Sequence, residues 1–481
     1  MADNATIRFV LDGDIIELTS VDPTRTVLQY LREDLRRKGT KEGCAEGDCG
    51  ACTVVLAELK RDGETVALKA INSCIQFLPT LDGKELITVE SLTPDGDLHP
   101  VQEAMVRNHG SQCGFCTPGF VMSLYALYES NAKPNRREID DALAGNLCRC
   151  TGYRPIIAAA HDMYVIDSVA RVDRQQNLKR VQRSTSLVVE SGDRRFFAPQ
   201  SVAELAKLMS QYPDATLLAG GTDVGLWVTK QHRELDTVVY TGCVSELQII
   251  SESPEALEIG AAVSFTDATP VLLKHFPGLE ELLRRFASPP IRNAGTLGGN
   301  IANGSPIGDS MAALMVLDAV LVLRHGDVER EIDINDFYHD YRVNDLQPGE
   351  VLIRIRIPFV SAGTIVSSQK WSKRFDQDIS AICTAYRLTL DGGRVAAFQM
   401  ACGGLAGTVR RARRTEASIV GKLWNEETIE LACQQLDDDF APISDMRASA
   451  DIRRIAVKNL LRRFLMETGT ASLPTVYTYG R

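Results

Sequence analysis

Residues 1–92 carry the hydrophobic pattern of a small β-rich unit. Apolar residues alternate with polar ones from Ile7 to Leu11 and resume after Asp12-Gly13, which predicts a β-hairpin. Asp22-Pro23 predicts the start of a helix, with an apolar face within residues 27–35. The run 53–59 predicts a further strand that leads into a second hairpin. We therefore expect a small domain of strands with one helix.

From residue 93 to residue 170 the pattern becomes helical. Thr117-Pro118 predicts one helix start, residues 137–144 form a shorter helix, and Pro155 begins another that runs towards Ser168. Residues 171–190 follow as a linker. Its first part is polar and basic with no periodic apolar face, which predicts a solvated tether.

From residue 191 onward strands and helices alternate. An alternating strand at 353–357 ends at Pro358, so we expect one domain at 191–362 and a C-terminal domain at 363–481. The latter is predicted to mix strands at 385–390 and 395–401 with helices at 427–436 and 448–466. At about 150 residues per domain, 481 residues accommodate this multidomain α+β organisation.

Composition narrows the function classes. The formal net charge of −10 disfavours a nucleic-acid-binding protein, because phosphate binding relies on an excess of Lys and Arg. No apolar run approaches the roughly 18 residues that cross a bilayer. The N-terminus lacks the basic start and apolar stretch of a secretory signal, so a cytoplasmic location is expected.

The cysteines are unevenly distributed. Eight of the twelve fall within the first 150 residues, and the other four are scattered singly. Disulfides fit poorly in a cytoplasmic chain, where thiols stay reduced. Dense cysteine in such a chain indicates metal ligation.

The first group has the spacing of a plant-type [2Fe–2S] ferredoxin, with Cys44-x4-Cys49-x2-Cys52 and the remote Cys74. Glycines at 43, 47 and 50 let such a loop curl and aim N–H groups at negatively charged sulfurs. A zinc site is the alternative, but structural zinc prefers paired C-x2-C hooks. The spacing favours iron–sulfur.

The second group is Cys113-x2-Cys116 and Cys148-x-Cys150. Both pairs precede predicted helices, whose N-termini favour thiolates and the negative charge of a cluster. Zinc remains an alternative for this group taken alone. Beside a ferredoxin-like unit a second cluster is favoured, since a lone redox centre needs an electron partner.

Three segments carry a family resemblance: Lys41–Thr53 (KEGCAEGDCGACT), Gln112–Gly119 (QCGFCTPG) and Gly145–Pro155 (GNLCRCTGYRP). They closely resemble the molybdenum hydroxylases, the family of xanthine dehydrogenase and aldehyde oxidoreductase. The resemblance implies one [2Fe–2S] cluster on the first cysteine group and another on the second. It also implies that the second cluster lies nearest a molybdopterin, and it makes Gln112 a candidate interface residue with the molybdopterin subunit.

Two glycine segments suggest a flavin site. Residues 217–225 are predicted to form a strand, a Gly220-Gly221 turn and a helix, where a diphosphate can approach backbone N–H groups. Residues 294–309 supply a second such loop. The first segment lacks the G-x-G-x-x-G pattern, which argues against a nicotinamide-binding Rossmann unit there.

Both glycine segments resemble the FAD-binding domain of the same family. The resemblance places FAD contacts on Leu217, Leu218, Ala219, Gly220, Gly221, Thr222, Asp223, Val224, Phe286, Thr296, Leu297, Gly298, Gly299, Asn300, Asp309, Leu352 and Lys370. Leu352 and Lys370 depend on a weaker local match near Gln369-Lys-Trp-Ser-Lys-Arg. Non-covalent FAD is expected.

The resemblance implies a fold of four parts: a β-grasp plant-type ferredoxin domain, an all-α [2Fe–2S] domain, an FAD domain of the p-cresol methylhydroxylase type and a C-terminal α+β domain. This order most resembles the iron–sulfur/FAD small subunits of bacterial xanthine dehydrogenases. Electrons from purine oxidation on a larger molybdopterin subunit would pass through both clusters to FAD and on to NAD⁺. No catalytic residue is expected on this chain, and a heterotetramer with two copies of each subunit is expected by analogy.

Two alternatives remain at this point. The same kind of redox subunit can serve a hydroxylase for aldehydes or other N-heterocycles, because substrate selection lies in the other subunit. The other alternative is a zinc-binding scaffold. The residues do not distinguish NAD⁺ from O₂ as the acceptor.

Overall fold

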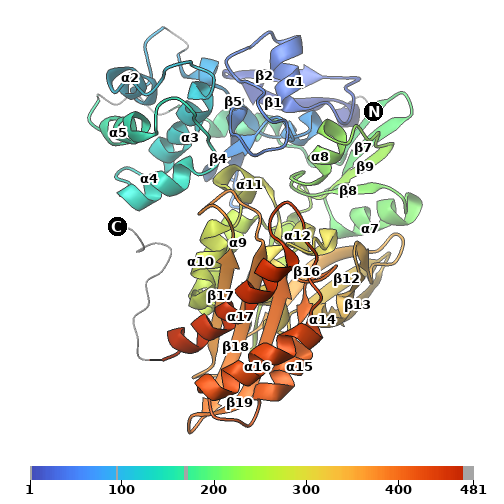
Figure 1. Ribbon diagram of the computed structural model, residues 1–481. Coiled ribbons are helices and arrows are strands. Elements are labelled where there is room, and N and C mark those ends of the chain that lie inside the picture. The colour runs from blue at the N-terminus through green and yellow to red at the C-terminus, as the bar shows by residue number, and fades with distance from the viewer. Residues whose placement is uncertain (1–2, 94–95, 167–171, 470–481) are drawn as a thin grey trace. The chain divides into compact units, whose positions relative to one another are not determined.

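The computed structural model describes residues 3–93, 96–166 and 172–469, and it divides the chain into two compact units (Figure 1). Unit 1 comprises Met1–Glu246 and Ser288–Gly295, and unit 2 comprises Leu247–Ala287 and Thr296–Arg481. The segment Ser288–Gly295 therefore folds with unit 1, although its sequence neighbours on both sides fold with unit 2.

Unit 1 begins with a five-stranded sheet in the order β2-β1-β5-β3-β4. The strands are β1 (Ile7–Leu11), β2 (Asp14–Leu18), β3 (Thr53–Leu59), β4 (Val66–Asn72) and β5 (Glu85–Ile87). β1 and β5 pair in parallel and the other neighbours are antiparallel, so the sheet is the mixed sheet of a β-grasp fold. Both predicted hairpins are present, and the predicted strand 53–59 is β3 to the residue.

The helix beside this sheet begins later than predicted. Thr26, rather than Asp22, caps α1 (Val27–Gln29), because its hydroxyl accepts the Gln29 N–H at 3.1 Å and the Gln29 side chain accepts the Thr26 N–H at 2.9 Å. The Asp22 carboxylate instead accepts the N–H and the hydroxyl of Thr24, both at 2.8 Å. Asp22 therefore closes a local turn before the helix.

Four helices form the next part of unit 1: α2 (Pro100–Arg107), α3 (Thr117–Ser130), α4 (Arg136–Leu143) and α5 (Arg154–Asp162). Phe120 and Leu124 of α3 are fully buried, in one core cluster with Val55 of β3 and Ala70 of β4. The helical part therefore packs on one face of the ferredoxin-like sheet. The predicted end of the last helix, at Ser168, lies outside the described residues.

The prediction of a solvated tether after residue 171 is wrong. Residues Gln175–Val181 form helix α6, with Leu178 and Val181 fully buried. The Arg183 guanidinium bonds to both carboxylate oxygens of Asp82, at 2.5 and 2.8 Å, and Arg174 pairs with Glu85 at 3.2 Å. Two apolar residues and two buried ion pairs hold this segment against the ferredoxin sheet, although its composition is polar.

The rest of unit 1 is a four-stranded sheet in the order β6-β7-β9-β8 with three helices. The elements are β6 (Leu187–Ser191), β7 (Arg194–Ala198), α7 (Val202–Gln211), β8 (Thr216–Leu218), α8 (Val224–Thr229), β9 (Thr237–Tyr240) and α11 (Pro289–Ala294). β9 lies between β7 and β8 and is parallel to both.

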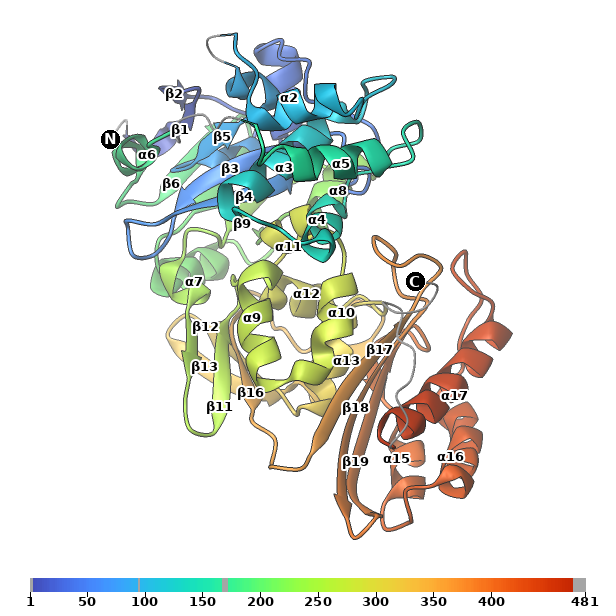
Figure 2. The ribbon, with the colours of Figure 1, turned by 90° about the vertical axis from the view of Figure 1, so that its left-hand side faces the viewer.

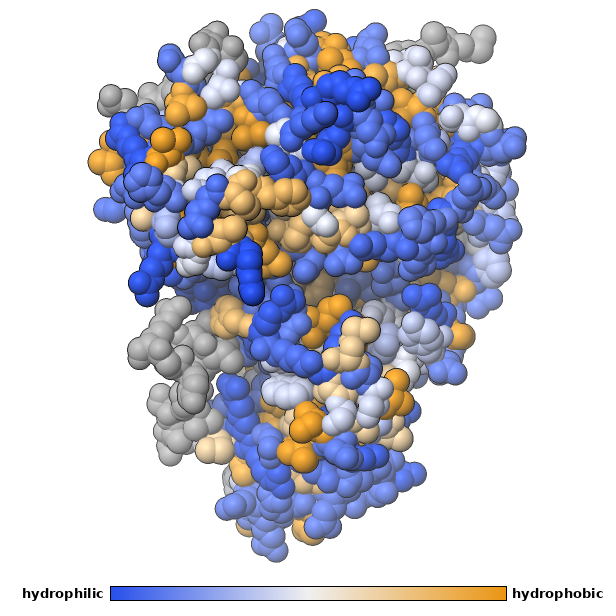
Figure 3. Space-filling view, turned by 45° about the horizontal axis from the view of Figure 1, so that its top comes forward, coloured by the Kyte–Doolittle hydropathy of each residue, from blue (hydrophilic) through white to orange (hydrophobic). Residues whose placement is uncertain are grey.

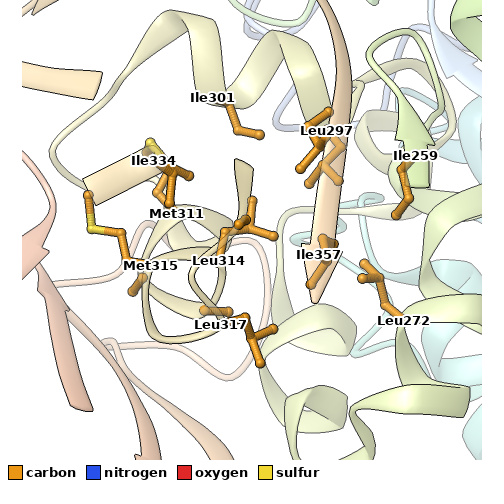
Figure 4. Packing of buried hydrophobic residues seen from close by; sticks show 14 of the residues in the cluster. Ile259, Leu272, Leu297, Ile301, Met311, Leu314, Met315, Leu317, Ile334 and Ile357 are labelled. Atoms are coloured by element: carbon orange, nitrogen blue, oxygen red, sulfur yellow. The ribbon is translucent and has the colours of Figure 1, made fainter. Parts of the chain in front are cut away.

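Unit 2 contains an antiparallel sheet in the order β10-β11-β16-β12-β13. Its strands are β10 (Ile250–Glu252), β11 (Ala256–Gly260), β12 (Val320–His325), β13 (Val328–Asp333) and β16 (Val351–Pro358). Its helices are α9 (Phe265–His275), α10 (Glu280–Arg285), α12 (Leu297–Asn303), α13 (Asp309–Val316) and α14 (Ile334–Phe337), and β14 (Tyr338–Asp340) pairs with β15 (Val343–Asn344). Figure 4 shows Leu297 and Ile301 of α12 in the core beside Ile357 of β16.

The C-terminal part of unit 2 is an antiparallel sheet in the order β17-β18-β19-β20. Its elements are β17 (Ile365–Trp371), β18 (Ile382–Asp391), β19 (Arg394–Gly403), β20 (Arg410–Arg411), α15 (Arg413–Ile419), α16 (Glu426–Asp439) and α17 (Ala450–Glu467). Helices α15 to α17 lie on one face of the sheet, and α10 and α13 lie on the other (Figure 2). Within the described residues, no helix combines the length and apolar character needed to cross a membrane.

Candidate functional site

The first four cysteines converge on one loop of the ferredoxin-like sheet. Cys52 directly precedes β3 and Cys74 follows β4 by two residues, and both are buried. Cys44 contacts the thiols of Cys49 and Cys74, and Cys74 in turn contacts Cys52. The structure therefore brings together all four residues that the spacing predicted.

Backbone amides of the loop point at the Cys44 sulfur. Its Sγ accepts N–H groups from Glu46 at 3.4 Å, Asp48 at 3.4 Å and Cys49 at 3.3 Å. Contacts with the Cys49 and Cys74 thiols, together with these backbone bonds, hold the pKa of Cys44 far below its ordinary value. Amide donors around a sulfur are what a negatively charged cluster needs.

Glycines make this loop conformation accessible. Gly47 and Gly50 have φ values of +77° and +70°, in the left-handed region that favours glycine. A Cβ at Gly43 would lie 2.7 Å from the Cys49 sulfur. Side chains at these positions would therefore strain the loop or displace a thiol.

The second four cysteines meet in two pairs. The sulfurs of Cys113 and Cys150 are 3.6 Å apart, and the thiols of Cys116 and Cys148 are in contact. Cys116 is the N-cap residue of α3, whereas Cys148 and Cys150 lie in the loop before α5. Burial raises the pKa of Cys148, but hydrogen bonds from the Thr151 hydroxyl and N–H outweigh it and lower that pKa overall.

The thiol arrangement fits two-iron clusters better than zinc. A structural zinc ion takes four ligands around one centre. A [2Fe–2S] cluster spreads four thiolates over two irons, and the Cys113–Cys150 and Cys116–Cys148 pairs suit that division.

The two cysteine loops are joined directly. The Asn146 side chain, 4% exposed, accepts the Ser123 hydroxyl at 2.6 Å and donates to the Gly50 carbonyl at 3.2 Å. A Cβ at Gly50 would lie 2.1 Å from the Gly145 carbonyl oxygen. Asn146 was missed by sequence reasoning, because a buried asparagine between motif residues looks like any polar loop residue.

The first glycine segment, Leu217–Val224, lies in unit 1 and runs from β8 through a turn into α8, as predicted. A Cβ at Gly220 would lie 1.9 Å from the carbonyl oxygen of Ala294 in α11. Gly221 has a φ of +71°. Packing therefore requires glycine at 220, and the backbone conformation favours glycine at 221, whether or not a diphosphate approaches them.

Of the second glycine segment, residues 296–309 lie in unit 2, and Leu297–Asn303 form α12. The Thr296 hydroxyl caps the helix by accepting the Gly299 N–H at 3.0 Å. Leu297 and Ile301 anchor the helix in the core (Figure 4), and a Cβ at Gly298 would lie 2.5 Å from the Ala261 Cβ. Gly299 and Asn300 are half-buried, so this part of the segment keeps access to solvent.

Asp309 and Lys370, predicted from separate segments, form one buried cluster in unit 2. The Lys370 ammonium lies 2.9 Å from one Asp309 carboxylate oxygen, and the Ser380 hydroxyl donates to the other at 2.6 Å. The Lys370 and Asp309 side chains are 2% and 4% exposed. Ser380 was not predicted, because nothing in the residues around it distinguishes it from a loop serine.

The other two predicted flavin residues lie in or at the core of unit 2. Phe286 packs against Phe265 with ring centroids 4.3 Å apart. Leu352 is buried in β16 within the same core cluster. Contacts of these two residues with FAD stay predictions.

Each of the four structural parts of the chain matches a known domain family. Four family models match the chain: a 2Fe-2S iron-sulfur cluster binding domain over 9–77, a [2Fe-2S] binding domain over 88–161, an FAD binding domain in molybdopterin dehydrogenase over 190–360, and a CO dehydrogenase flavoprotein C-terminal domain over 367–468. Xanthine dehydrogenase of Emericella nidulans is 33% identical over 90% of this chain and 36% of its own length. The chain belongs to the molybdenum hydroxylase family.

Other molybdenum hydroxylases give the same picture. Mouse xanthine dehydrogenase/oxidase is 31% identical over 90% of this chain and 36% of its own length. The chain thus spans little more than a third of these curated relatives. What it carries is the electron-transfer part of the family architecture: two iron–sulfur-binding domains and one FAD-binding domain.

Solved structures match a smaller part of the chain. A carbon monoxide dehydrogenase from Hydrogenophaga pseudoflava is 28% identical with a TM-score of 0.54, over 56% of this chain and 94% of that one. Quinoline 2-oxidoreductase from Pseudomonas putida 86 is 28% identical with a TM-score of 0.53, over the same shares.

Proposed function

We propose that this chain is the electron-transfer subunit of a xanthine dehydrogenase. It receives electrons from a molybdopterin subunit, passes them through two [2Fe–2S] clusters to FAD, and reduces NAD⁺. The observation that carries the proposal is the order of domains: both cluster domains and the flavin domain follow one another on a chain that aligns with xanthine dehydrogenase over 90% of its length.

The alternative is the same redox role in a hydroxylase for aldehydes or other N-heterocycles. The 28% identity to quinoline 2-oxidoreductase supports this alternative. That relative, however, is matched over 94% of its own chain by only 56% of this one. Its chain therefore corresponds to part of this one, whereas the xanthine dehydrogenases align with nearly all of it.

In this proposal each of the two cysteine groups holds one [2Fe–2S] cluster. Cys44, Cys49, Cys52 and Cys74 hold the first cluster, and Cys113, Cys116, Cys148 and Cys150 hold the second. When bound, two-iron clusters carry single electrons and FAD collects two for hydride transfer to NAD⁺. The amides of Glu46, Asp48 and Cys49 offset negative charge at the Cys44 sulfur.

The flavin role rests on the two glycine segments and on the Asp309–Lys370 pair. Gly220 and Gly221 leave the backbone of their turn free of side chains, and Gly299 and Asn300 keep solvent access in α12. Asp309 holds Lys370 in place through the 2.9 Å ion pair, so Lys370 has one defined position in unit 2. We propose non-covalent FAD contacts on the residues predicted above.

The partner subunit is proposed to dock on the helical part around the second cluster. Cys113 and Cys150 are exposed, and so are the predicted interface residue Gln112 and the apolar Phe115, at 46%. Segments 111–119 and 145–155 contain no acidic residue, although the chain as a whole carries a net charge of −10. Figure 3 shows one face of the molecule, on which apolar residues lie among polar ones.

The surface formed by segments 111–119 and 145–155 is therefore apolar at Phe115 and mildly basic, through Arg149 and Arg154. It suits a partner surface with apolar and acidic groups. A heterotetramer and a cytoplasmic location stay predictions.

The test compares the isolated chain with the complex. The isolated chain should contain four irons, four labile sulfides and one FAD, by two clusters of two irons each, and should reduce dyes with NADH but not oxidise xanthine. The co-purified complex should form NADH from xanthine. A zinc-containing or colourless chain would refute the redox role, and activity with quinoline or aldehydes but not xanthine would select the alternative.

A further inference from the structure

The segment Ser288–Gly295 belongs to the flavin domain by sequence and to unit 1 by structure. The FAD-binding domain model covers 190–360, and the chain both enters and leaves this segment from unit 2. Its helix α11 packs against strand β4 of the ferredoxin-like sheet, where the Asn293 side chain donates to the Ala70 carbonyl at 2.8 Å. A piece of the flavin domain therefore sits beside the first cysteine loop.

Ile291 of α11 lies beside the first cysteine site. It packs, with Leu226 of α8, against a small buried cluster formed by Leu28, Cys52, Cys74 and Ile75. Its Cδ1 lies 3.1 Å from the position that a Cβ on Gly47 would occupy, inside the loop between Cys44 and Cys49. Ile291 thus lies against the cluster that contains Cys52 and Cys74 and beside the loop between Cys44 and Cys49.

The same segment has fixed contacts on two other sides. The carbonyl of Ala294 lies against Gly220 of the first flavin segment, as described above. At the other end, a Cβ at Gly145 would lie 2.8 Å from the Ser288 Cβ and 3.1 Å from the Pro290 Cδ. Ile291 therefore cannot move away from the cysteine loop without disturbing both ends of the segment.

The two cysteine sites differ in how deeply their cysteines are buried. Each site has two half-buried cysteines, but the other two are buried in the first site (Cys52 and Cys74, 1% and 2% exposed) and exposed in the second (Cys113 and Cys150). The apolar shell around Cys52 and Cys74 is completed by residues from outside the ferredoxin-like domain, Leu226 and Ile291.

We infer that Ser288–Gly295 closes the first cluster site, with Ile291 as a positioning residue that keeps water from the cluster. The inference rests on the proposed placement of that cluster on Cys44, Cys49, Cys52 and Cys74. Reduction adds an electron to a cluster that is already negative, and water stabilises the more highly charged form. Opening the shell therefore raises the midpoint potential of the first cluster and leaves the second unchanged.

The test is an EPR-monitored redox titration of the holoenzyme carrying Ile291→Ser. The second-cluster signal is assigned by its loss in Cys148→Ser and serves as an internal reference. Ile291→Val preserves an apolar side chain and should retain the wild-type potential. Ile16→Ser makes the same change on the hairpin strand β2, where Ile16 packs against a different core cluster.

The expected result is a higher midpoint potential for one cluster in Ile291→Ser, with full iron content and an unshifted second signal. Neither Ile291→Val nor Ile16→Ser should show this shift. If Ile291→Ser keeps both clusters and both potentials, the inference is overturned while the proposed function stands. If the wild-type chain lacks the first cluster, the proposed function itself has failed.

Discussion

The backbone N–H of Leu147 donates a 3.0 Å hydrogen bond to the carbonyl oxygen of Cys49. Leu147 directly precedes Cys148, so this bond connects the loop proposed to hold the first cluster with the loop proposed to hold the second. It supplies a short route of covalent bonds and one hydrogen bond between the two ligand sets. Movement of either loop would stretch that route.

Asn146 keeps this connection in register, which leads to the first prediction. Asn146→Ala leaves the buried Ser123 hydroxyl without its acceptor and removes one of the three donors to the Gly50 carbonyl, at a cost of about 1–3 kcal/mol in the free energy of unfolding. Electron transfer between the clusters should slow while both clusters remain bound. Freeze-quench EPR after mixing with NADH measures this directly.

Asn131→Ala is the matched control for Asn146, because the Asn131 side chain accepts only an exposed bond, from the Lys133 N–H at 3.0 Å. It should leave the rate at the wild-type value. Equal rates in the Asn146 and Asn131 variants would show that the connection does not set electron transfer.

The Asp309–Lys370 pair gives the second prediction. Asp309→Ala leaves a buried ammonium unpaired and should destabilise unit 2 by about 3–5 kcal/mol. The double variant Asp309→Asn/Lys370→Met removes both charges and should recover much of that loss. If the pair contacts FAD as proposed, the double variant should still retain less flavin than the wild type.

Thermal unfolding and flavin content after gel filtration separate the two roles of this pair. A stable double variant with a full complement of flavin would restrict Asp309 and Lys370 to a structural role.

A substitution at Gly221 tests whether the first glycine segment, Leu217–Val224, contacts FAD. Because its φ is +71°, a valine there is strained in any case, whereas asparagine tolerates this conformation. Gly221→Asn should therefore fold and lose FAD, since its side chain occupies the turn proposed to face the diphosphate. Gly192→Asn, in the β6–β7 turn with a φ of +59° and open space around it, is the control. If both variants keep a full complement of FAD, the proposed FAD contact at the Gly220-Gly221 turn is wrong.

His99 gives a pH prediction. Burial, with the nearby Arg174 charge, lowers the pKa of His99 to about 4 from its ordinary 6.5. Its Nδ1 accepts the Val101 N–H at 3.2 Å and caps α2, so protonation breaks the cap. The neutral histidine contributes stability that is fully present above pH 6.5 and is lost as the pH falls towards 4.

The helical domain should therefore lose its cluster absorption at a lower temperature at pH 5 than at pH 7. His99→Asn retains a capping side chain without a titrating group and should reduce this pH dependence. The same pH dependence in the variant would assign it to another group.

Local sequence pattern predicts the elements and ligand sets whose residues follow a regular spacing. The strand 53–59 follows from the alternation of apolar residues, and the convergence of the first four cysteines follows from their spacing, because four thiolates must reach one cluster. Helix α6 was missed because only Leu178 and Val181 are buried, and the remaining anchoring comes from ion pairs with distant residues.

Ile291 and Ser380 show the same limit in the site itself. Neither lies in a motif, and each matters because another segment approaches it: the cysteine loop for Ile291 and Asp309 for Ser380. Such contacts are set by tertiary packing, which no window of the sequence contains.

The most direct test of the proposed electron path, from the molybdopterin subunit through both clusters to FAD, uses the complex with Cys148→Ser. The complex is mixed anaerobically with xanthine in a stopped-flow spectrometer. In the wild type, xanthine should bleach the flavin absorbance. In the variant, which lacks the second cluster, xanthine should leave the flavin oxidised, while NADH still reduces it at the wild-type rate. Flavin reduction by xanthine at the wild-type rate, with the second cluster lost, would contradict the proposed electron path.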